Sequence, residues 1–284
     1  MLKTGIKLFT VVFLSQLATV CFAYDFSVEN DGTKIYYKIK NAIDTVAVTS
    51  KDDAYGSYFG DVNIPDSVVY DGKTYIVGEI GNSAFRNCES LSSVKIPNGV
   101  TSIGDDAFRK CTRITNIKLP TGLKTIGYYA FGMTDLDSIS VPSKVEEIGG
   151  MAFADCANLK SVKLPDKLKI IDNYAFMNCR NLRTLNIPDK IEIIGRSAFF
   201  NCVLLGEDVY IGINIKRIGL YAFGNCYNIK RVHCFGEMYI PYCEEGAFGD
   251  VTPINKTLIV PYGYKESYTK LPVWKDFENV KEEE

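Results

Sequence analysis

The sequence predicts a single elongated solenoid domain, in which short structural repeats stack on their neighbours. The dipeptide Ala-Phe recurs eight times, from Ala84-Phe85 to Ala247-Phe248, at intervals of 22 to 25 residues. An apolar pair with strand-like alternation, such as Val94 and Ile96, recurs at the same interval. A fixed period in this range is the signature of a solenoid, which displays side chains along its length instead of around one buried pocket.

Residues 91–113 illustrate one repeat. Apolar and polar residues alternate at its start, which predicts a short strand, and Pro97 ends that strand because it has no N–H to donate. Gly104 follows where the chain turns sharply, and Asp105 or Asp106 can cap a short helical turn that carries the Ala-Phe pair inward. Nine such turns, stacked at the strand spacing, would form a body on the order of 40 Å long.

Composition adds few constraints. The chain has 284 residues, of which 46% are hydrophobic and 23% charged, as is ordinary for a folded domain. Its 32 basic and 34 acidic residues give a net charge of −2, which does not suggest binding to nucleic acid.

The first 23 residues have the pattern of a secretory signal peptide. Two lysines precede an apolar run over residues 8–18, and Cys21-Phe22-Ala23 supplies small residues at a cleavage site. Removal of residues 1–23 takes the net charge from −2 to −4. Two alternatives remain: a membrane anchor, although the run is short for a span, and lipid attachment at Cys21, although Val20 is bulky for that motif. No later segment is apolar enough to span a bilayer, so we expect an exported mature chain at the cell surface, outside the cell or in the periplasm.

The repeated motif L-x-x-V-x-I-P followed by I-G-x-x-A-F-x-x-C resembles the BspA-like class of leucine-rich repeats over residues 60–261. The resemblance implies a leucine-rich-repeat solenoid of β-dominated α/β repeats, with parallel concave strands and short helical turns, capped at both ends. Residues 24–59 resemble the family's N-terminal strand cap, and residues 262–284 its C-terminal cap. The resemblance also implies a secreted or surface-exposed protein of host-associated bacteria, for which adhesion or ligand binding is usually proposed. The third repeat departs from the pattern because it lacks the cysteine, and the sixth because Gly212 replaces the proline.

Six of the nine cysteines share one phase of the repeat, four residues after each alanine. They are Cys88, Cys111, Cys156, Cys179, Cys202 and Cys226. Stacked neighbours at this phase would hold their side chains parallel, too far apart for the close Cβ approach of a disulfide. We therefore expect buried free thiols rather than disulfides or a zinc site, which needs four convergent ligands. Cys234 and Cys243 lie outside this phase, and their pairing stays open.

Catalysis is not expected. The chain has one histidine, His233, which the register places on the outward face of a strand beside Arg231, where it would be exposed. An exposed histidine without a nucleophile or carboxylate partner does not define a catalytic site. No nucleophile elbow, zinc-protease, P-loop or dinucleotide motif occurs, and no cofactor is implied.

The outward strand positions suggest where a ligand would bind. One column runs through Asn63, Lys95, Lys118, Ser140, Lys163, Asn186, Tyr210 and His233, and Arg231 lies in the neighbouring column. From these we take Lys95, Lys118, Lys163, Tyr210, Arg231 and His233 as candidate ligand-binding residues on a concave face. The alternative is that the lysines only keep the strand face soluble.

Two functions are compatible with these sequence features. The first is a non-catalytic interaction or adhesion module at the bacterial cell surface, which would bind a host or bacterial surface protein or glycan. The second is a structural surface or periplasmic scaffold without a specific ligand.

Overall fold

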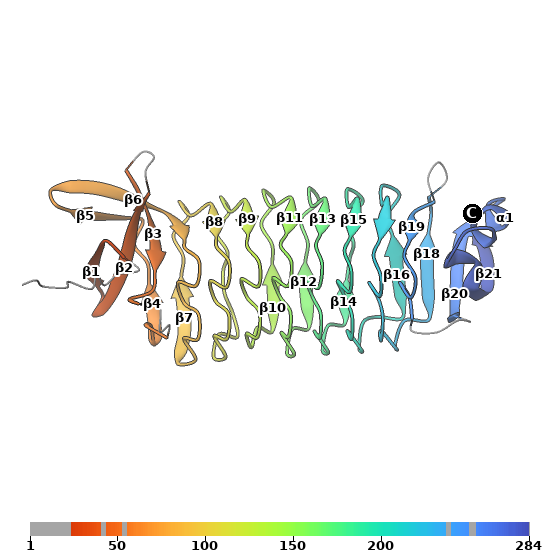
Figure 1. The fold of residues 1–284 in the computed structure, drawn as a ribbon, viewed down its shortest axis with the longest axis horizontal. Helices are drawn as coiled ribbons and strands as arrows, with labels where there is room; N and C mark the ends of the chain where they lie inside the picture. Colours follow the sequence, from red (N-terminus) through yellow and green to blue (C-terminus); the bar gives the residue numbers. More distant parts are fainter. Residues whose placement is uncertain (1–23, 41–43, 53–55, 237–239, 250–253, 284) are drawn as a thin grey trace, which may run out of the picture.

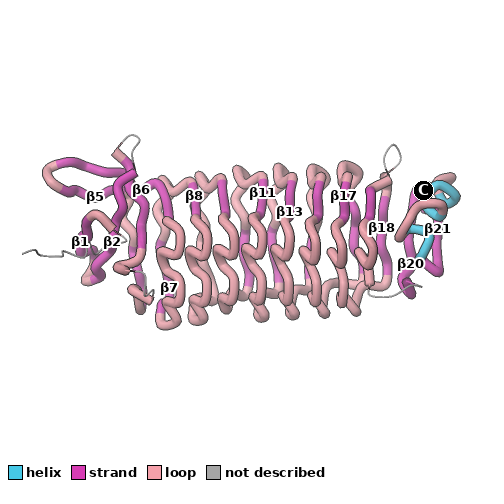
Figure 2. The backbone as a smooth tube through the Cα atoms, in the orientation of Figure 1, coloured by secondary structure: helices cyan, strands magenta, loops and turns pink. Residues whose placement is uncertain are grey.

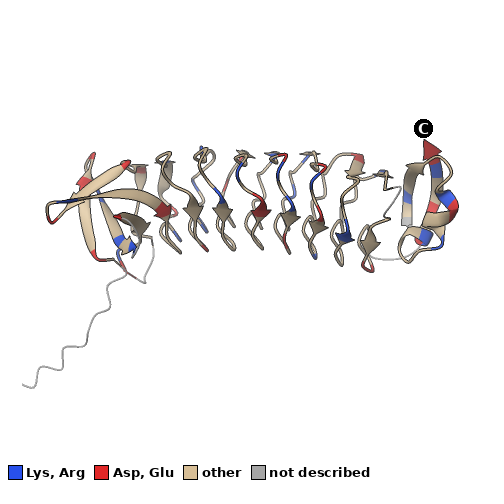
Figure 3. Ribbon diagram, turned by 90° about the horizontal axis from the view of Figure 1, so that it is seen from above, with Lys and Arg blue, Asp and Glu red and all other residues tan. Residues whose placement is uncertain are grey.

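The computed structural model describes residues 24–283, except for residues 41–43, 53–55, 237–239 and 250–253. Nine turns stack along a nearly straight axis, with one row of strands along one side and a second row, mostly of two-residue strands, along another (Figures 1 and 2). Because the stack is nearly straight in the views of Figures 1 and 3, the face expected to be concave is close to flat.

The predicted strands form the first strand row. It contains β4 (Gly60–Asn63), β7 (Leu91–Lys95), β10 (Ser138–Ser140), β12 (Ser161–Lys163), β14 (Thr184–Leu185), β16 (Asp208–Ile211), β18 (Arg231–Cys234) and β20 (Ile254–Pro261). Residues 115–119 occupy the same position between β7 and β10, without the hydrogen-bond pattern of a strand. Pairing within the row is parallel. It joins residues 23 apart in the pairs β10–β12, β12–β14 and β16–β18, as the period predicts. The β4–β7 pair joins residues 31 to 32 apart, because the hairpin of β5 (Ser67–Tyr70) and β6 (Lys73–Ile80) is inserted between these strands.

A second strand row, which the sequence patterns did not predict, follows the first in each turn. It contains β6 (Lys73–Ile80), β8 (Ser102–Ile103), β9 (Thr125–Ile126), β11 (Glu147–Ile148), β13 (Ile170–Ile171), β15 (Ile193–Ile194), β17 (Arg217–Ile218) and β19 (Tyr242–Cys243). These strands pair in parallel as one continuous sheet. The glycine that follows most of them allows close stacking, since a methyl group on Gly195 would lie 2.6 Å from the backbone nitrogen of Asn173.

The expected short helical turns around each Ala-Phe pair are absent from the described repeats, and consecutive tight turns take their place. In the first of them Ser83 and Asn87 have φ values of 55° and 57°, which a right-handed helix excludes. Every second amide N–H of this segment donates to the next turn of the solenoid. Phe85 N–H donates to the Ala107 carbonyl of that turn at 2.7 Å, whereas Arg86 N–H donates to the Ser83 carbonyl of its own turn at 3.1 Å. The backbone thus joins neighbouring repeats here too, which a helical turn with internal bonds would not do.

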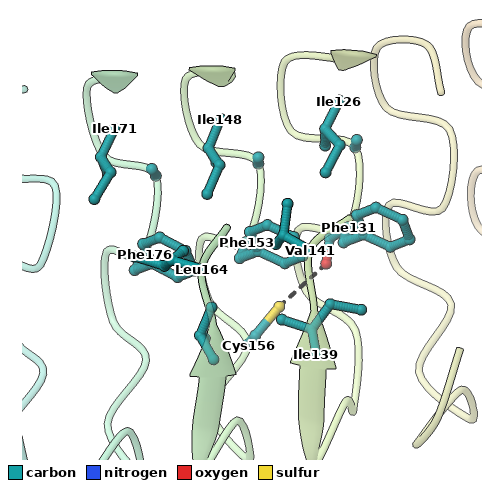
Figure 4. Packing of buried hydrophobic residues seen from close by; sticks show 14 of the residues in the cluster. Ile126, Phe131, Ile139, Val141, Ile148, Phe153, Cys156, Leu164, Ile171 and Phe176 are labelled. Atoms are coloured by element: carbon teal, nitrogen blue, oxygen red, sulfur yellow. Dashed lines mark hydrogen bonds between the residues drawn. The ribbon is translucent and has the colours of Figure 1, made fainter. Parts of the chain in front are cut away.

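The eight repeat phenylalanines form one internal stack. Adjacent ring centroids lie 4.9 to 5.5 Å apart, with planes within 1 to 9° of parallel. Figure 4 shows three of them, Phe131, Phe153 and Phe176, packed beneath the isoleucines of the second row. Each ring is fully buried, so this stack is the core that one repeat could not form alone.

The cysteines line this core as predicted, and they also satisfy a backbone acceptor. The Cys156 thiol donates to the Phe131 carbonyl of the preceding turn at 3.1 Å (Figure 4), and the Cys179 thiol does the same to Phe153 at 3.2 Å. In the repeat that lacks the cysteine, the Thr134 hydroxyl bonds the carbonyl of Phe131 within its own turn at 2.8 Å. All eight described cysteines are free and buried, which includes Cys234 and Cys243.

The two ends of the stack are built differently. At the N-terminal end, β1 (Phe26–Asn30), β2 (Thr33–Lys40) and β3 (Thr45–Thr49) form an antiparallel meander that continues the second row through β6, and β5 (Ser67–Tyr70) pairs with β6 as a projecting hairpin (Figure 1). At the other end lie α1 (Lys265–Thr269), η1 (Trp274–Asp276) and β21 (Phe277–Glu283), which pairs in parallel with β20.

Aromatic residues close the phenylalanine stack at both ends. The Tyr58 ring lies 4.6 Å from Phe85, and the Trp274 ring lies 5.6 Å from Phe248. Trp274 is buried, and its indole N–H donates to the Pro241 carbonyl at 2.8 Å. These contacts keep the first and last rings away from water, as a solenoid requires of its terminal units.

Residues 1–23, with the predicted signal peptide and Cys21, lie outside the described part of the chain. The predicted domain boundaries at residues 59 and 261 stay predictions. Among the described residues, no helix has the length and apolar character needed to cross a membrane.

Candidate ligand-binding face

The outward side of the first strand row carries the column of residues expected from the sequence. The pairing of β10 with β12 places Ser140 directly beside Lys163, and the pairing of β16 with β18 places Tyr210 beside His233. Inward and outward side chains alternate along each strand of this row. Each turn therefore contributes one outward side chain to the column. Lys95, Lys118 and Lys163 are all exposed.

Two shallow depressions follow one another on this face between β7 and β14. The smaller, of about 150 Å³, lies between Lys95 and Lys118. The larger, of about 490 Å³, covers β10, β12 and β14. Its polar lining consists of Ser138, Ser140, Ser161, Lys163, Asp166, Thr184 and Asn186.

Short side chains open the larger depression. The column passes from Lys118 to Ser140 to Lys163, so a serine stands between two long side chains. Ser138 and Ser161 occupy consecutive turns of the neighbouring column, which the register of β10 and β12 confirms. The face therefore offers hydroxyl groups in a hollow whose central strand also carries the ammonium group of Lys163, and Lys118 lies on the turn before it.

The three column lysines are not neutralised by the protein itself. Among the described residues none of them has a carboxylate oxygen within ion-pair distance. Some lysines at other phases of the repeat do: Lys160 Nζ lies 2.8 Å from Asp137 of the preceding turn, and Lys216 Nζ lies 2.7 Å from Glu192. Basic and acidic residues are both distributed along the stack in Figure 3.

The C-terminal part of the same face has a different character. Arg231 holds Asp208 with two charge-assisted bonds, from Nε to Oδ1 and from Nη2 to Oδ2, both 2.5 Å long. His233 Nε2 lies 2.8 Å from Asp208 Oδ1. These contacts, with Arg231 the main cause, lower the pKa of Asp208 to about 2, so this carboxylate stays ionised at neutral pH.

The prediction that His233 is exposed is wrong. The residue is only 7% exposed. The Tyr210 ring covers one side of the imidazole, with centroids 4.3 Å apart and planes at 18°, and Glu283 of β21 approaches Nδ1 at 3.8 Å. Tyr210 itself is 54% exposed. An outward-facing strand residue is thus buried by its neighbours from the turns before and after it.

The six predicted residues therefore fall into two groups. Lys95, Lys118 and Lys163 are exposed and unpaired beside the two depressions. Arg231 and His233 are engaged with Asp208, and Tyr210 covers His233. We take the first group, together with the serines that line the larger depression, as the candidate site.

The serines of the larger depression were not among the residues predicted to bind a ligand. The sequence could have indicated these serines as part of a depression. Short side chains on consecutive turns of a strand face leave space between longer neighbours. The absence of acidic partners for the lysines depends on the placement of side chains from the loops, which the strand register does not give.

The described residues contain no cluster of three or more histidine, cysteine or acidic side chains suited to a metal ion. Burial raises the pKa of Cys234 to about 11 and that of Cys226 to about 12, so these thiols stay protonated and unreactive at neutral pH. The face can offer charge, hydroxyl groups and shape to a ligand, and these properties suit binding.

A stack of parallel-stranded turns, with one buried phenylalanine in each Ala-Phe repeat, defines a solenoid. The sequence profile of the BspA type leucine-rich repeat region matches residues 78–206 and 147–268 with six copies, and the chain belongs to this family.

Solved structures of bacterial leucine-rich repeat proteins are similar to this chain. A leucine-rich cell surface protein from Faecalibacterium prausnitzii shares the fold and is 19% identical, with a TM-score of 0.50 over 92% of this chain and 95% of the other. A leucine-rich repeat protein from Bacteroides ovatus is 22% identical, with a TM-score of 0.48 over 90% of this chain and 88% of the other. No curated protein matches the sequence.

Proposed function

We propose that this chain is an exported, non-catalytic interaction module that binds a macromolecular ligand at the bacterial cell surface through the first strand row. The observation that carries the proposal is the column of exposed lysines without acidic partners, Lys95, Lys118 and Lys163, beside two depressions. Exposed lysines without an ion pair, placed beside a depression, keep their charge available to an external partner.

The family and the N-terminal sequence support export. One of the similar structures is named a cell surface protein, and residues 1–23 have the pattern of a signal peptide. Cell fractionation with N-terminal sequencing tests this part. We expect a mature chain that begins at Tyr24 in the surface or extracellular fraction, and a full-length chain in the cytoplasm would contradict export.

The function itself is tested by ligand screening with matched variants. The wild-type chain is applied to an array of glycans and to surface and matrix proteins, beside a variant with Lys95→Glu, Lys118→Glu and Lys163→Glu. A second triple variant, Lys144→Glu, Lys167→Glu and Lys190→Glu, changes the net charge equally. These control lysines are also exposed, lie at one phase of three consecutive turns, and have no ion pair among the described residues.

We expect both variants to melt within about 2 °C of the wild type, because exposed charges contribute little to folding. Only the first should lose ligand binding. If binding survives in the first variant, the ligand contacts another surface of the chain. If no ligand is found, the structural scaffold becomes the better description.

A further inference from the structure

We infer that the depressions between β7 and β14 form a track for a linear acidic polysaccharide that lies along the solenoid axis, with its carboxylate or sulfate groups on the column lysines. This inference rests on the proposed function and names the chemistry of its ligand.

The spacing of the cations matches a polymer that runs across the strands. Adjacent turns lie about 4.8 Å apart, so Lys118 and Lys163, separated by the turn of Ser140, repeat at about 10 Å. An extended polysaccharide with one acidic group per disaccharide presents its charges at a similar interval. Lys95 stands one further turn away, at the other side of the smaller depression, and extends the same line.

The polar lining of the larger depression suits sugar hydroxyls. Ser138, Ser140, Ser161 and Thr184 each supply one donor and two acceptor positions, and Asn186 supplies an amide. Asp166 is the acidic residue of this lining, and it can accept bonds from hydroxyl groups. Because the lining contains no aromatic ring, a neutral sugar would lack a stacking surface, and charge must supply much of the affinity.

An acidic peptide fits this surface less well. A peptide that adds to a sheet needs a free strand edge, but β12 is bonded to β10 on one side and to β14 on the other. The depression is also shallow and lined at its surface by short polar side chains, so it offers no deep pocket for an apolar anchor.

Titration calorimetry with defined polymers tests the inference. The probes are hyaluronan fragments, which carry one carboxylate per disaccharide, chondroitin sulfate, which adds a sulfate, neutral dextran, and poly-glutamate. We expect binding of one or both acidic polysaccharides, with affinity that falls as salt rises, and no binding of dextran. Preference between the first two distinguishes a carboxylate from a sulfate ligand.

Three variants locate the site. Lys118→Gln with Lys163→Gln should weaken binding about tenfold, whereas Lys144→Gln with Lys167→Gln should leave it unchanged. Ser140→Gln, which fills the depression without a change of charge, should weaken binding as well.

Several results would overturn the inference. Equal weakening by the two lysine pairs would indicate unspecific attraction, and tighter, site-dependent binding of poly-glutamate would indicate an acidic protein. If neither polysaccharide binds while a protein ligand depends on the column lysines in the array experiment, the polysaccharide track is excluded and the proposed function stands.

Discussion

Replacement of Phe153 by alanine is the perturbation that most directly challenges the role of the phenylalanine stack. The Phe153 ring is fully buried, and the rings of Phe131 and Phe176 lie on either side of it at 5.3 Å. Large-to-small changes of a buried phenylalanine cost about 3–5 kcal/mol, and each aromatic contact adds about 0.5–1.5 kcal/mol beyond buried area. The cavity cannot close easily, because Phe153 N–H is bonded to Ala175 and the Cys179 thiol is bonded to the Phe153 carbonyl. We therefore expect a loss of about 4–5 kcal/mol.

Urea unfolding followed by circular dichroism measures this loss, and the melting temperature should fall by roughly 10 °C or more. Phe59→Ala is the matched control, since Phe59 is 75% exposed, and its effect should stay within about 0.5 kcal/mol. Hydrogen exchange should show lost protection first in the turns of Phe131 and Phe176, because repeats contact only their neighbours. A loss below about 1 kcal/mol for Phe153→Ala, or an effect equal to that of the control, would refute the assignment of the stack as the core.

The remaining predictions concern thiols, acid stability and the C-terminal end. Maleimide should label none of the eight described cysteines in the folded protein at pH 8 and all of them in denaturant without reductant, and four or fewer labels in denaturant would mean that disulfides cross-link the repeats. Because the pKa of Asp208 is lowered from 3.8 to about 2, its stabilising effect is complete above about pH 4 and is lost as the pH falls through about 2. Asp208→Asn should remove this part of the acid dependence of the urea midpoint, and an unchanged profile would contradict the pairing with Arg231. Trp274→Ala should uncover Phe248 and cost about 3–5 kcal/mol, whereas a loss like that of a surface residue would show that Trp274 does not close the stack.

The repeat period was sufficient to predict the solenoid, the inward phenylalanines and the register of the first strand row. These features follow from alternation and spacing, which act on every turn in the same way. The free thiols could be predicted for the same reason, because side chains at one phase of stacked turns stay parallel.

The second strand row and the tight turns could not be read in this way. Two-residue strands such as Ser102–Ile103 are too short to show alternation, and their pairing depends on the neighbouring turn. A helical turn was expected around each Ala-Phe pair because aspartates precede the pair in the repeat of residues 91–113. In the structure every second amide N–H of this segment donates to a carbonyl of the next turn. These hydrogen bonds join residues far apart in the sequence, so local capping signals do not predict them.

The candidate site shows the same division. The positions of Lys95, Lys118 and Lys163 on one face came from the register, whereas the burial of His233 came from contacts that the register does not contain. The Tyr210 ring stacks on the imidazole of His233, and Glu283 of β21 approaches its Nδ1 atom, so His233 is buried.

The central claim is that the first-row face between β7 and β14 contacts the ligand, and site-specific photo-crosslinking tests it most directly. A photoreactive phenylalanine analogue is placed at Ser140, in the larger depression, or at Tyr128, which is 48% exposed outside this face. After irradiation with the ligand that the array identifies, we expect adducts from position 140 and none from position 128. Adducts from position 128 alone, or from both positions equally, would contradict the claim.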